Sequence, residues 1–257
     1  MTTLVIERAA GVVTVTLNRP EKKNAINDDM WHELLETCRA IANNTDEDRV
    51  VVITGAGGEF CSGADLSGGV ASEVHGLTHM RQVGEVCLAV HALPQPVIAK
   101  VSGVAAGAGL NLALGCDLVV AGDDARFSEI FARRGLSVDF GGSWVLPRLV
   151  GLHKAKELVL LADIIDAKEA QDYGIVNRVV PTAQLDAFVD DWAERLAAGP
   201  PIALTMSKRL LNQSSAMSLA QAVEAEAQAQ NVNFASQDTT EAMAAFLEKR
   251  DPTFRGR

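Results

Sequence analysis

Two short turns rich in glycine and alanine follow directly on hydrophobic segments of this chain. The first turn occupies residues 55–65, after the valine-rich segment 50–54, and the second occupies residues 102–109, after residues 97–101. Small residues let a backbone turn tightly and approach a ligand closely, with amide N–H groups free to point at it. The second turn leads into the apolar helical segment 110–114, so its amides lie at a helix N-terminus, which favours negative charge. If the two turns meet in space, their N–H groups form an oxyanion hole that stabilises an enolate.

Length, composition and charge narrow the class of protein. The 257 residues suffice for one large domain with a sizeable core, and 48% hydrophobic with 22% charged residues is typical of globular proteins. No segment reaches the roughly 18 uninterrupted apolar residues of a membrane span, and the N-terminus lacks the pattern of a secretory signal. The net charge of −10 argues against a general nucleic-acid surface. We therefore expect a cytoplasmic protein without a membrane or nucleic-acid partner.

The cysteines and histidines indicate neither a metal site nor covalent catalysis. The 4 cysteines and 5 histidines are scattered, without the spacing of a disulfide framework or of a metal site. Cys61 and Ser143 are potential nucleophiles, but neither has the adjacent base that nucleophilic catalysis requires. We expect reduced thiols and no bound metal.

Strand and helix signals alternate up to Pro181 and become purely helical after it. Strands are predicted over residues 4–7, 12–17, 50–54, 97–101 and 116–121, and helices over residues 30–42 (capped by Asp28 or Asp29) and 79–93. Further helices are predicted over residues 183–198, 201–212, 218–235 and 241–249, the last with Asp238 and Glu241 as a capping box. The alternation predicts an α/β fold of repeated ββα or βαβ units. We place a boundary near residue 195, between a core (1–195) and a helical region (196–257).

Two motifs resemble the crotonase (enoyl-CoA hydratase/isomerase) superfamily. They are FCSGADL at residues 60–66 and VSGVAAGAGLNLA at residues 101–113, and the resemblance extends over nearly the whole chain. It implies a spiral of ββα repeats, a C-terminal helical trimerisation region, and homotrimers that often pair into dimers of trimers. It also implies an acyl-CoA thioester substrate, with coenzyme A as part of the substrate and no permanently bound cofactor.

The same resemblance implies the positions of the binding site. The backbone N–H groups of Ala64 and Ala108 would form the oxyanion hole. Coenzyme A contacts are implied at Lys22, Lys23, Ala25, Ser62, Asp65, Leu66, Phe246 and Lys249. The last two often reach the site from an adjacent subunit. Taken alone, the two loop lysines would be solubilising charges, and the terminal pair one core side chain and one surface charge.

Two glutamates of the family's hydratases are replaced in this chain. Hydratases carry them where this chain has Asn111 and Phe131. Adding water across a double bond needs a base to activate the water and an acid to protonate the α-carbon. Asparagine cannot take up a proton at neutral pH, and phenylalanine does no acid–base work. Hydration by two glutamates is therefore predicted to be disabled, and both residues are expected to line the acyl pocket.

One candidate acid remains in the expected pocket. Asp139 lies four residues after Gly135 and resembles the aspartate of dienoyl-CoA isomerases and of the phenylacetate-pathway ring-epoxide isomerases. A single carboxylate can remove a proton made acidic by the thioester and return it to another carbon. Phe131, Phe140 and Trp144 are expected to surround it, raising its pKa and excluding water. The alternative is a solvated loop carboxylate or a helix cap.

The chain is thus predicted to be an acyl-CoA isomerase that moves a double bond or rearranges a related ring, with Asp139 as its sole proton shuttle. The alternatives are an enoyl-CoA hydratase, in which Glu129 or Asp139 organises water, and a non-catalytic member that binds coenzyme A or RNA. Glu129 lies two residues before Phe131, so a local shift of the chain would bring it inward as a rival acid, but a surface or rim charge is the expectation. Asp117 is expected to serve structure, and residues 67–81 to shape the acyl pocket.

Overall fold

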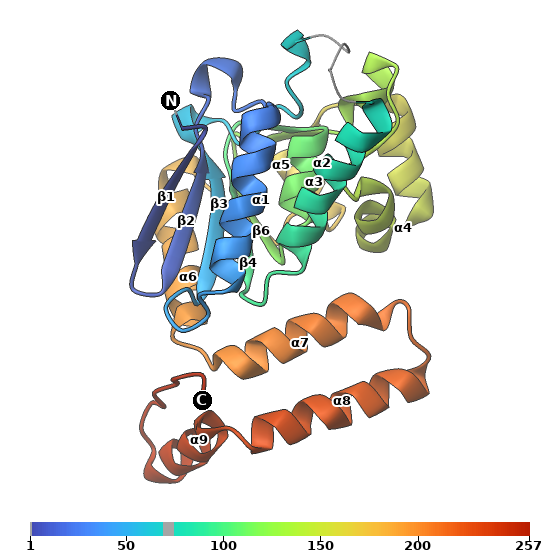
Figure 1. Ribbon diagram of the computed structural model, residues 1–257. Helices are drawn as coiled ribbons and strands as arrows, with labels where there is room; N and C mark the ends of the chain where they lie inside the picture. The colour runs from blue at the N-terminus through green and yellow to red at the C-terminus, as the bar shows by residue number, and fades with distance from the viewer. Residues whose placement is uncertain (1, 69–74) are drawn as a thin grey trace.

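The computed structural model describes residues 2–68 and 75–257 of the chain. Figure 1 shows an α/β body, which contains the N-terminus, and below it a layer formed by the last three helices. These helices are α7 (Pro201–Ser214), α8 (Leu219–Phe234) and α9 (Gln237–Glu248). The described residues after Pro181 contain helices and no strand, as predicted. The predicted division near residue 195 and the trimerisation role of the last helices remain predictions.

The body is built on a six-stranded sheet in the order β1-β2-β3-β4-β6-β9. The strands are β1 (Leu4–Ala9), β2 (Val12–Leu17), β3 (Val50–Gly55), β4 (Val97–Val101), β6 (Leu118–Gly122) and β9 (Arg178–Val180). β1 and β2 form an antiparallel hairpin, and every later neighbour in the sheet pairs in parallel. Parallel neighbours need a crossover between them, and α1 (Asp28–Ala42) and α2 (Gly76–His91) provide the first two.

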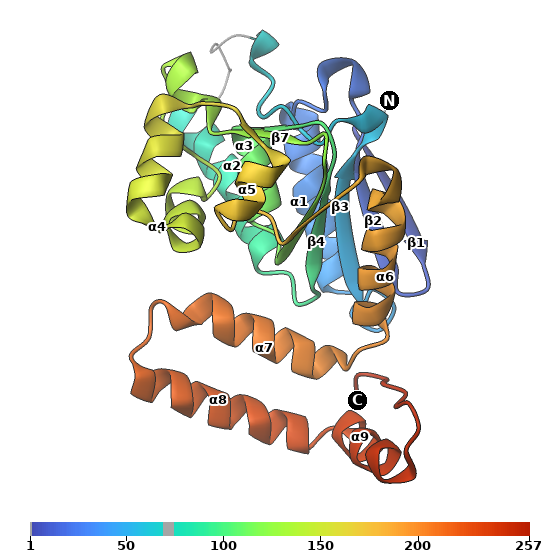
Figure 2. The same ribbon diagram turned by 180° about the vertical axis from the view of Figure 1, so that it is seen from behind.

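Helices cover both faces of this sheet, which explains the unbroken run of valine and isoleucine in β3. Val51 and Ile53 belong to the main core, on the face that α1 and α2 cover (Figure 1). Val50 and Val52 belong to a second core on the opposite face, against α6 (Leu185–Ala197). Figure 2 shows α6 on that rear face. A strand buried on both faces has no polar positions to alternate with its apolar ones.

A second, three-stranded sheet carries the second glycine-rich turn. It consists of β5 (Val104–Ala106), β7 (Arg126–Ser128) and β8 (Ile165–Asp166), in the order β5-β7-β8. β5 lies inside the segment predicted as a turn, and α3 (Ala108–Leu114) begins two residues before the predicted helix. This turn therefore consists of a short strand, the single residue Gly107 and the first residues of a helix.

The hydrophobic pattern did not predict α4 (Gly142–Leu161) or α5 (Ala167–Asp172). α4 contains Pro147 and is broken at Gly151, whose φ of 75° and ψ of 158° are not helical. The break shifts the apolar positions of the two halves relative to each other, so no single helical period runs through the segment. α5 is only six residues long, which is too short for a clear period.

Two predicted helix caps are wrong. α1 begins at Asp28, and its cap is Asn27, whose side chain accepts the N–H of Met30 at 3.1 Å. Because the helix starts earlier than predicted, Asp28 and Asp29 are first-turn residues.

α9 is likewise capped by a residue that the analysis did not select. Its cap is Ser236, whose hydroxyl accepts the N–H of Thr239 at 3.2 Å. Asp238 is buried inside the first turn and accepts the N–H groups of Arg255 and Gly256, at 2.7 and 2.8 Å. Asp238 therefore fastens the C-terminal tail instead of capping the helix.

An ion pair fastens the helical layer to the body. Lys208 on α7 contacts Asp117 at 2.7 Å and also donates to the carbonyl of Gln95 at 2.9 Å. Asp117 in turn accepts the N–H of Val97, the first residue of β4, at 2.7 Å. The structural role predicted for Asp117 is confirmed by these contacts.

Replacing Lys208 by methionine is expected to lower the free energy of unfolding by about 1.5–3 kcal/mol, because the Asp117 carboxylate loses a charged donor. Urea denaturation measures this change. Lys168→Met is the matched control, since Lys168 pairs with Asp172 on the surface of α5 and such pairs contribute at most about 1 kcal/mol. Equal losses of unfolding free energy in the two variants would mean that the Lys208–Asp117 pair stabilises the fold no more than a surface ion pair does.

Candidate active site

The two glycine-rich turns meet in space, as the sequence predicted. Cys61 of the first turn donates its N–H to the carbonyl of Val104 at 2.8 Å and accepts the N–H of Ala106 at 2.9 Å. Gly109 of the second turn packs directly on Cys61, since a Cβ at Gly109 would lie 2.4 Å from the Cys61 carbonyl oxygen. The strand-like hydrogen bonds of Cys61 and the close contact allowed by the absence of a side chain at Gly109 together hold the two turns in one fixed arrangement.

The N–H of Ala108 lies at the start of α3. Gly107 precedes it with φ 54° and ψ −128°, a conformation that L side chains rarely adopt. Gly107 donates its own N–H to Ser128 on β7 at 2.9 Å, so the position of the turn is fixed from both sides. Within residues 2–68 and 75–257, the Ala108 N–H has no acceptor.

The N–H of Ala64 is free for a related reason. Ile26 pairs with the first turn through the neighbours of Ala64: its N–H donates to the Gly63 carbonyl at 2.8 Å, and its carbonyl accepts the Asp65 N–H at 2.9 Å. This pairing uses the groups on either side of Ala64 and leaves the Ala64 N–H without an acceptor in the described part of the chain. Ala64 and Ala108 line the same pocket, so both N–H groups are available to a ligand there.

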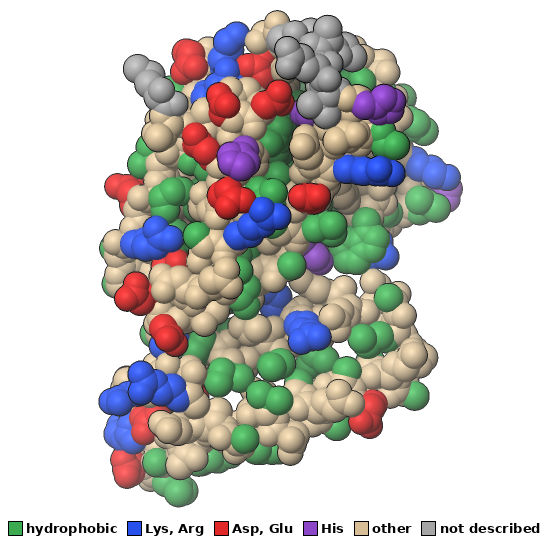
Figure 3. Space-filling model, viewed as in Figure 1, with side chains coloured by type: hydrophobic (Ala, Val, Ile, Leu, Met, Phe, Trp, Pro, Cys, Tyr) green, Lys and Arg blue, Asp and Glu red, His purple; other side chains and the backbone are tan. Residues whose placement is uncertain are grey.

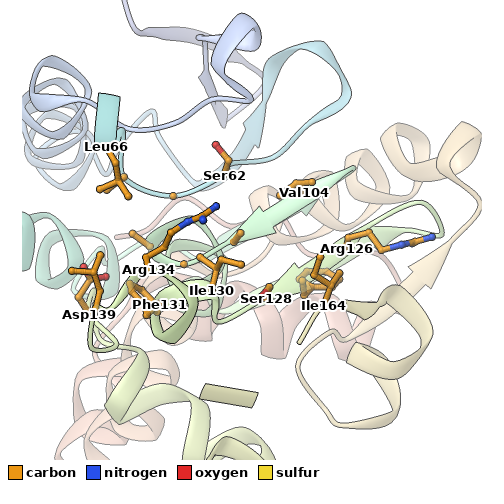
Figure 4. A pocket seen from close by; sticks show the side chains of 17 residues that line it. Ser62, Leu66, Val104, Arg126, Ser128, Ile130, Phe131, Arg134, Asp139 and Ile164 are labelled. Atoms are coloured by element: carbon orange, nitrogen blue, oxygen red, sulfur yellow. The ribbon is translucent and has the colours of Figure 1, made fainter. Parts of the chain in front are cut away.

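The pocket between the turns has a volume of about 280 Å³ and is mostly apolar. Figure 4 shows Leu66 on one side of it and Phe131, Ile130 and Asp139 on the other. Its lining also includes the two glycine-rich turns and residues that were not predicted from the sequence: Arg126, Ser128, Arg134, Leu136 and Ile164. No sequence motif distinguished these residues, because they lie on β7, near the end of η4 (Ile130–Arg134) and before β8, which fold together only in the tertiary structure.

Asp139 lies on the wall of this pocket, close to Phe131 (Figure 4). Burial raises the pKa of its carboxyl to about 6. Its Oδ1 atom is buried and has no hydrogen-bond partner among the described residues. Asp139 caps no helix, since the cap position of α4 is Gly141 and no side chain bonds there. The site therefore holds a carboxyl group whose pKa is raised to about 6 and whose Oδ1 atom has no donor among the described residues.

The expectation that Glu129 is a surface or rim charge is wrong. Its side chain is only 2% exposed, and burial raises its pKa to about 7. Asn111 on α3 donates to the Glu129 carboxyl at 3.4 Å and to the backbone carbonyl of Asp139 at 2.9 Å. α3 and the loop before α4 cover the position from two sides, and no local pattern in the sequence around Glu129 encodes this.

Only one of the four residues expected in the acyl pocket lines it. Phe131 does, whereas Asn111 is buried beneath the wall. Phe140 is buried away from the pocket and stacks on Trp31, with 5.3 Å between ring centroids. Trp144 is 39% exposed on α4, where the Arg148 guanidinium lies 3.9 Å from its ring centroid. Phe140 lies in the loop before α4 and Trp144 on α4, and neither lines the pocket that holds Asp139, so the expectations for Phe140 and Trp144 are wrong.

The loop residues implied in coenzyme A binding gather near the first turn. Ser62 and Leu66 line the pocket, and the Ser62 hydroxyl donates to the Lys22 carbonyl at 3.1 Å. The side chain of Lys22 is exposed, and Lys23 pairs with Glu59 at 2.8 Å.

Two further members of that set lie close by. Ala25 is buried next to the loop that holds Lys22 and Lys23, and its carbonyl accepts a hydrogen bond from the Arg19 guanidinium at 2.6 Å. Hydrogen bonds from Ser67, followed by that from Arg19 at 2.8 Å, hold the pKa of Asp65 well below its usual range. Both residues thus stabilise the loop.

Phe246 and Lys249 lie elsewhere. They are at the end of α9, at the opposite end of the molecule from the first turn (Figure 1), and Phe246 is 80% exposed. A single chain does not bring them to the pocket. Of the segment expected to shape the acyl pocket, residues 69–74 lie outside the described residues, and the remainder forms η3 (Leu66–Gly68) and the start of α2.

The site has no sign of a metal or of an activated thiol. Burial raises the pKa of Cys61 to about 12, so this cysteine remains a thiol at neutral pH. The described residues contain no group of three or more His, Cys, Asp or Glu side chains able to hold a metal ion. They also contain no helix that is both long and apolar enough to cross a bilayer.

The fold agrees with comparisons to known proteins. The family model described as enoyl-CoA hydratase/isomerase matches residues 7–257. The chain belongs to the enoyl-CoA hydratase/isomerase family, within the crotonase superfamily. The predicted α/β class and crotonase fold are thereby confirmed.

The similarity extends over the full length of several relatives. The chain is 40% identical over 256 residues to "Probable enoyl-CoA hydratase" of Rhodobacter capsulatus, covering 99% of this chain and 98% of the relative. It is 38% identical over 253 residues to 1,2-epoxyphenylacetyl-CoA isomerase of Escherichia coli, covering 96% of each. The crystal structure of enoyl-CoA hydratase from Bacillus anthracis matches with a TM-score of 0.94 at 33% identity, over 99% of this chain and 100% of that one.

Proposed function

We propose that this protein is an acyl-CoA isomerase, which moves a carbon–carbon double bond or rearranges a related ring with Asp139 as its proton shuttle. One observation carries the proposal: a half-buried carboxyl with a raised pKa lies in the same pocket as two backbone N–H groups that lack an acceptor among the described residues. The glutamate positions of the hydratases hold Asn111 and Phe131, and neither side chain can exchange a proton.

The proposed reaction uses these groups in a fixed order. The thioester carbonyl oxygen of an acyl-CoA accepts hydrogen bonds from the Ala64 and Ala108 N–H groups. The Asp139 carboxylate removes a proton from the carbon that the thioester acidifies, and the resulting dienolate carries its charge on the held oxygen. Protonated Asp139 then returns the same proton to a different carbon. The substrate and product have the same composition, so no water or cofactor is consumed.

A hydratase is the second candidate, favoured by the name of the Rhodobacter capsulatus relative and by the buried acid Glu129. A non-catalytic member that binds coenzyme A is a third, and the net charge of −10 argues against RNA as its ligand. The described lining of the pocket argues against hydration, because none of those residues except Asp139 has a carboxylate that could activate water.

The three candidates are separated by one set of incubations followed by mass spectrometry. The purified protein is given a 3-enoyl-CoA, a 2-enoyl-CoA and a ring-epoxide acyl-CoA in turn. An isomer formed without any change in mass supports the proposal. Gain of one water from the 2-enoyl-CoA at an enzyme-like rate overturns it in favour of hydration, and binding without turnover of any substrate favours the non-catalytic reading.

The proposal includes a homotrimer, or a dimer of trimers, in a cytoplasmic location. The helical layer supports the assembly, because many of its large apolar side chains are exposed in the single chain: Leu211, Leu219, Val223, Phe234, Met243 and Leu247. Figure 3 shows hydrophobic side chains gathered along this layer. In such an assembly, Phe246 and Lys249 of one subunit would be available to the coenzyme A site of another.

The proposed role of Asp139 predicts an acid limb in the pH profile of kcat/KM. Only the carboxylate can remove a proton, and its pKa is about 6. Activity is therefore expected to fall as the pH decreases through about 6 and then to drop about tenfold per pH unit, as for any single essential base. Initial rates of isomerisation measured from pH 5 upwards test this. A rate that stays constant down to pH 5 would contradict the assignment.

A further inference from the structure

We propose that Glu129 works as a neutral carboxylic acid paired with the amide of Asn111, and that this pair positions Asp139. The inference rests on the proposed isomerase function, in which Asp139 is the base. It concerns a residue that touches no substrate, since Glu129 does not line the pocket. Glu129 is therefore a positioning residue that acts through Asn111.

The first step is the burial of Glu129 without a counter-charge. Its side chain is among the largest that are fully buried, at 2% exposure, and no described cation forms an ion pair with it. The nearest cations in sequence are Arg126 on β7 and Arg133 and Arg134 on η4. The Arg126 guanidinium donates to the carbonyls of Asp124 and Ala125, at 3.1 and 2.8 Å. Arg133 pairs with Asp163 at 2.7 Å, and Arg134 lies on the pocket wall. A carboxylate buried without a cation is costly, whereas a protonated carboxyl is only a polar group that needs hydrogen bonds.

The second step is the contact between Glu129 and Asn111. The Asn111 Nδ2 atom donates to Glu129 Oε2 at 3.4 Å, which leaves Asn111 Oδ1 and Glu129 Oε1 as buried oxygens without a partner. Two bare oxygens cannot bond to each other. A proton on Glu129 Oε1 makes that atom a donor, and the acid and the amide then match donor for acceptor. Protonation thus accounts for both unpartnered atoms at once.

The third step links this pair to the proposed base. The Asn111 amide also donates to the backbone carbonyl of Asp139 at 2.9 Å, and the N–H of Gly142 donates to the same carbonyl at 3.0 Å. Gly142 packs against the amide so closely that a Cβ there would lie 2.4 Å from Nδ2. The orientation of the Asn111 amide, set by Glu129, therefore fixes where the loop presents Asp139.

Ionisation of Glu129 is expected to weaken this arrangement. A carboxylate repels the Asn111 Oδ1 atom that the acid had bonded, and it adds a negative charge beside the Asp139 carboxylate. The other ionisable group near the loop is the Cys87 thiol of α2, whose pKa is raised by burial and then by Asp139, so it stays neutral. Burial raises the pKa of Glu129 to about 7, which places the change within the working range of an enzyme.

Glu129→Gln and Glu129→Leu test the proposal, because glutamine keeps the hydrogen-bonding pattern of the acid at every pH and leucine removes it. The wild-type rate of isomerisation is expected to fall as the pH rises through about 7. In Glu129→Gln this alkaline limb is expected to disappear while the acid limb remains. In Glu129→Leu the rate is expected to be about 10- to 100-fold lower at all pH values, because small displacements of a catalytic group cost that much.

The controls keep the result separate from folding and from the isomerase proposal. Glu36→Gln changes an exposed carboxylate that bonds Arg39 on α1, and it is expected to leave the profile unchanged. Thermal melting of each variant checks the fold. Infrared spectra of the protein without substrate, wild type against Glu129→Gln, report the C=O stretch of a protonated carboxyl that is lost above about pH 7, whether or not the protein is an isomerase.

Two results would overturn the inference: an alkaline limb that Glu129→Gln retains, or a spectrum without the protonated carboxyl band at neutral pH. If the band is present and titrates but no acyl-CoA is isomerised, the proposed function fails and the acid–amide pair stands. If isomerisation depends on Asp139 but the band is absent, the function stands and the pairing fails.

Discussion

Replacing Asp139 by asparagine is expected to slow isomerisation by about 10²–10⁴-fold, the usual contribution of a general acid–base group. The asparagine side chain has the same shape as the aspartate but cannot take up a proton, so binding of the acyl-CoA is retained and the proton transfer is lost. The measurement is the initial rate of isomerisation at pH 7 to 8, together with exchange of the acidified proton for deuterium in heavy water.

The matched control for this prediction is Asp163→Asn. Asp163 is an exposed carboxylate that pairs with Arg133 and does not line the pocket. We expect its rate to stay close to that of the wild type. An Asp139→Asn variant with full activity would remove Asp139 from the mechanism.

Replacing Ala108 by proline is expected to reduce kcat by about 10²–10³-fold, because it deletes one donor of the proposed oxyanion hole. The substitution removes the N–H without requiring a new backbone shape. Ala108 is the first residue of α3, a position where proline suits a helix, and its N–H has no acceptor in the described part of the chain. Rate measurements at saturating acyl-CoA, with circular dichroism as the check on the fold, test the prediction.

Ala108→Gly provides the companion variant, since it alters the same position but keeps the N–H group. We expect it to retain most of the activity, with a loss of stability of about 0.5–1 kcal/mol from the greater freedom of glycine. If the glycine and proline variants are equally slow, the effect comes from the side chain or the helix and not from the missing donor.

Much of the body could be predicted because its signals are local. The strand over Val97–Val101 has the bounds that the hydrophobic pattern predicted, and the hairpin of β1 and β2 was recognised from its alternation and its turn. The glycine positions of the two turns were informative for the same reason. Gly107 and Gly109 are small because the backbone conformation or the neighbouring chain leaves no room for a side chain.

The errors concern residues whose environment is made by distant parts of the chain. Glu129 was expected at the surface, but α3 and the loop before α4 bury it. Phe140 and Trp144 were expected to surround Asp139, but Phe140 packs in the main core and Trp144 on α4 is exposed. Hydrophobicity and spacing do not report which of several apolar residues faces a particular cavity.

By itself, the sequence determined the class of fold and the positions of the two glycine-rich turns, and it predicted that Asn111 and Phe131 replace the hydratase glutamates, because backbone freedom and the chemistry of a side chain belong to the residue. Only the tertiary structure decided that the turns meet in one pocket, that Asp139 lies on its wall and that Glu129 is buried against Asn111. A pKa and a hydrogen-bond partner depend on what surrounds a group. In this protein those surroundings come from helices and strands far apart in the chain.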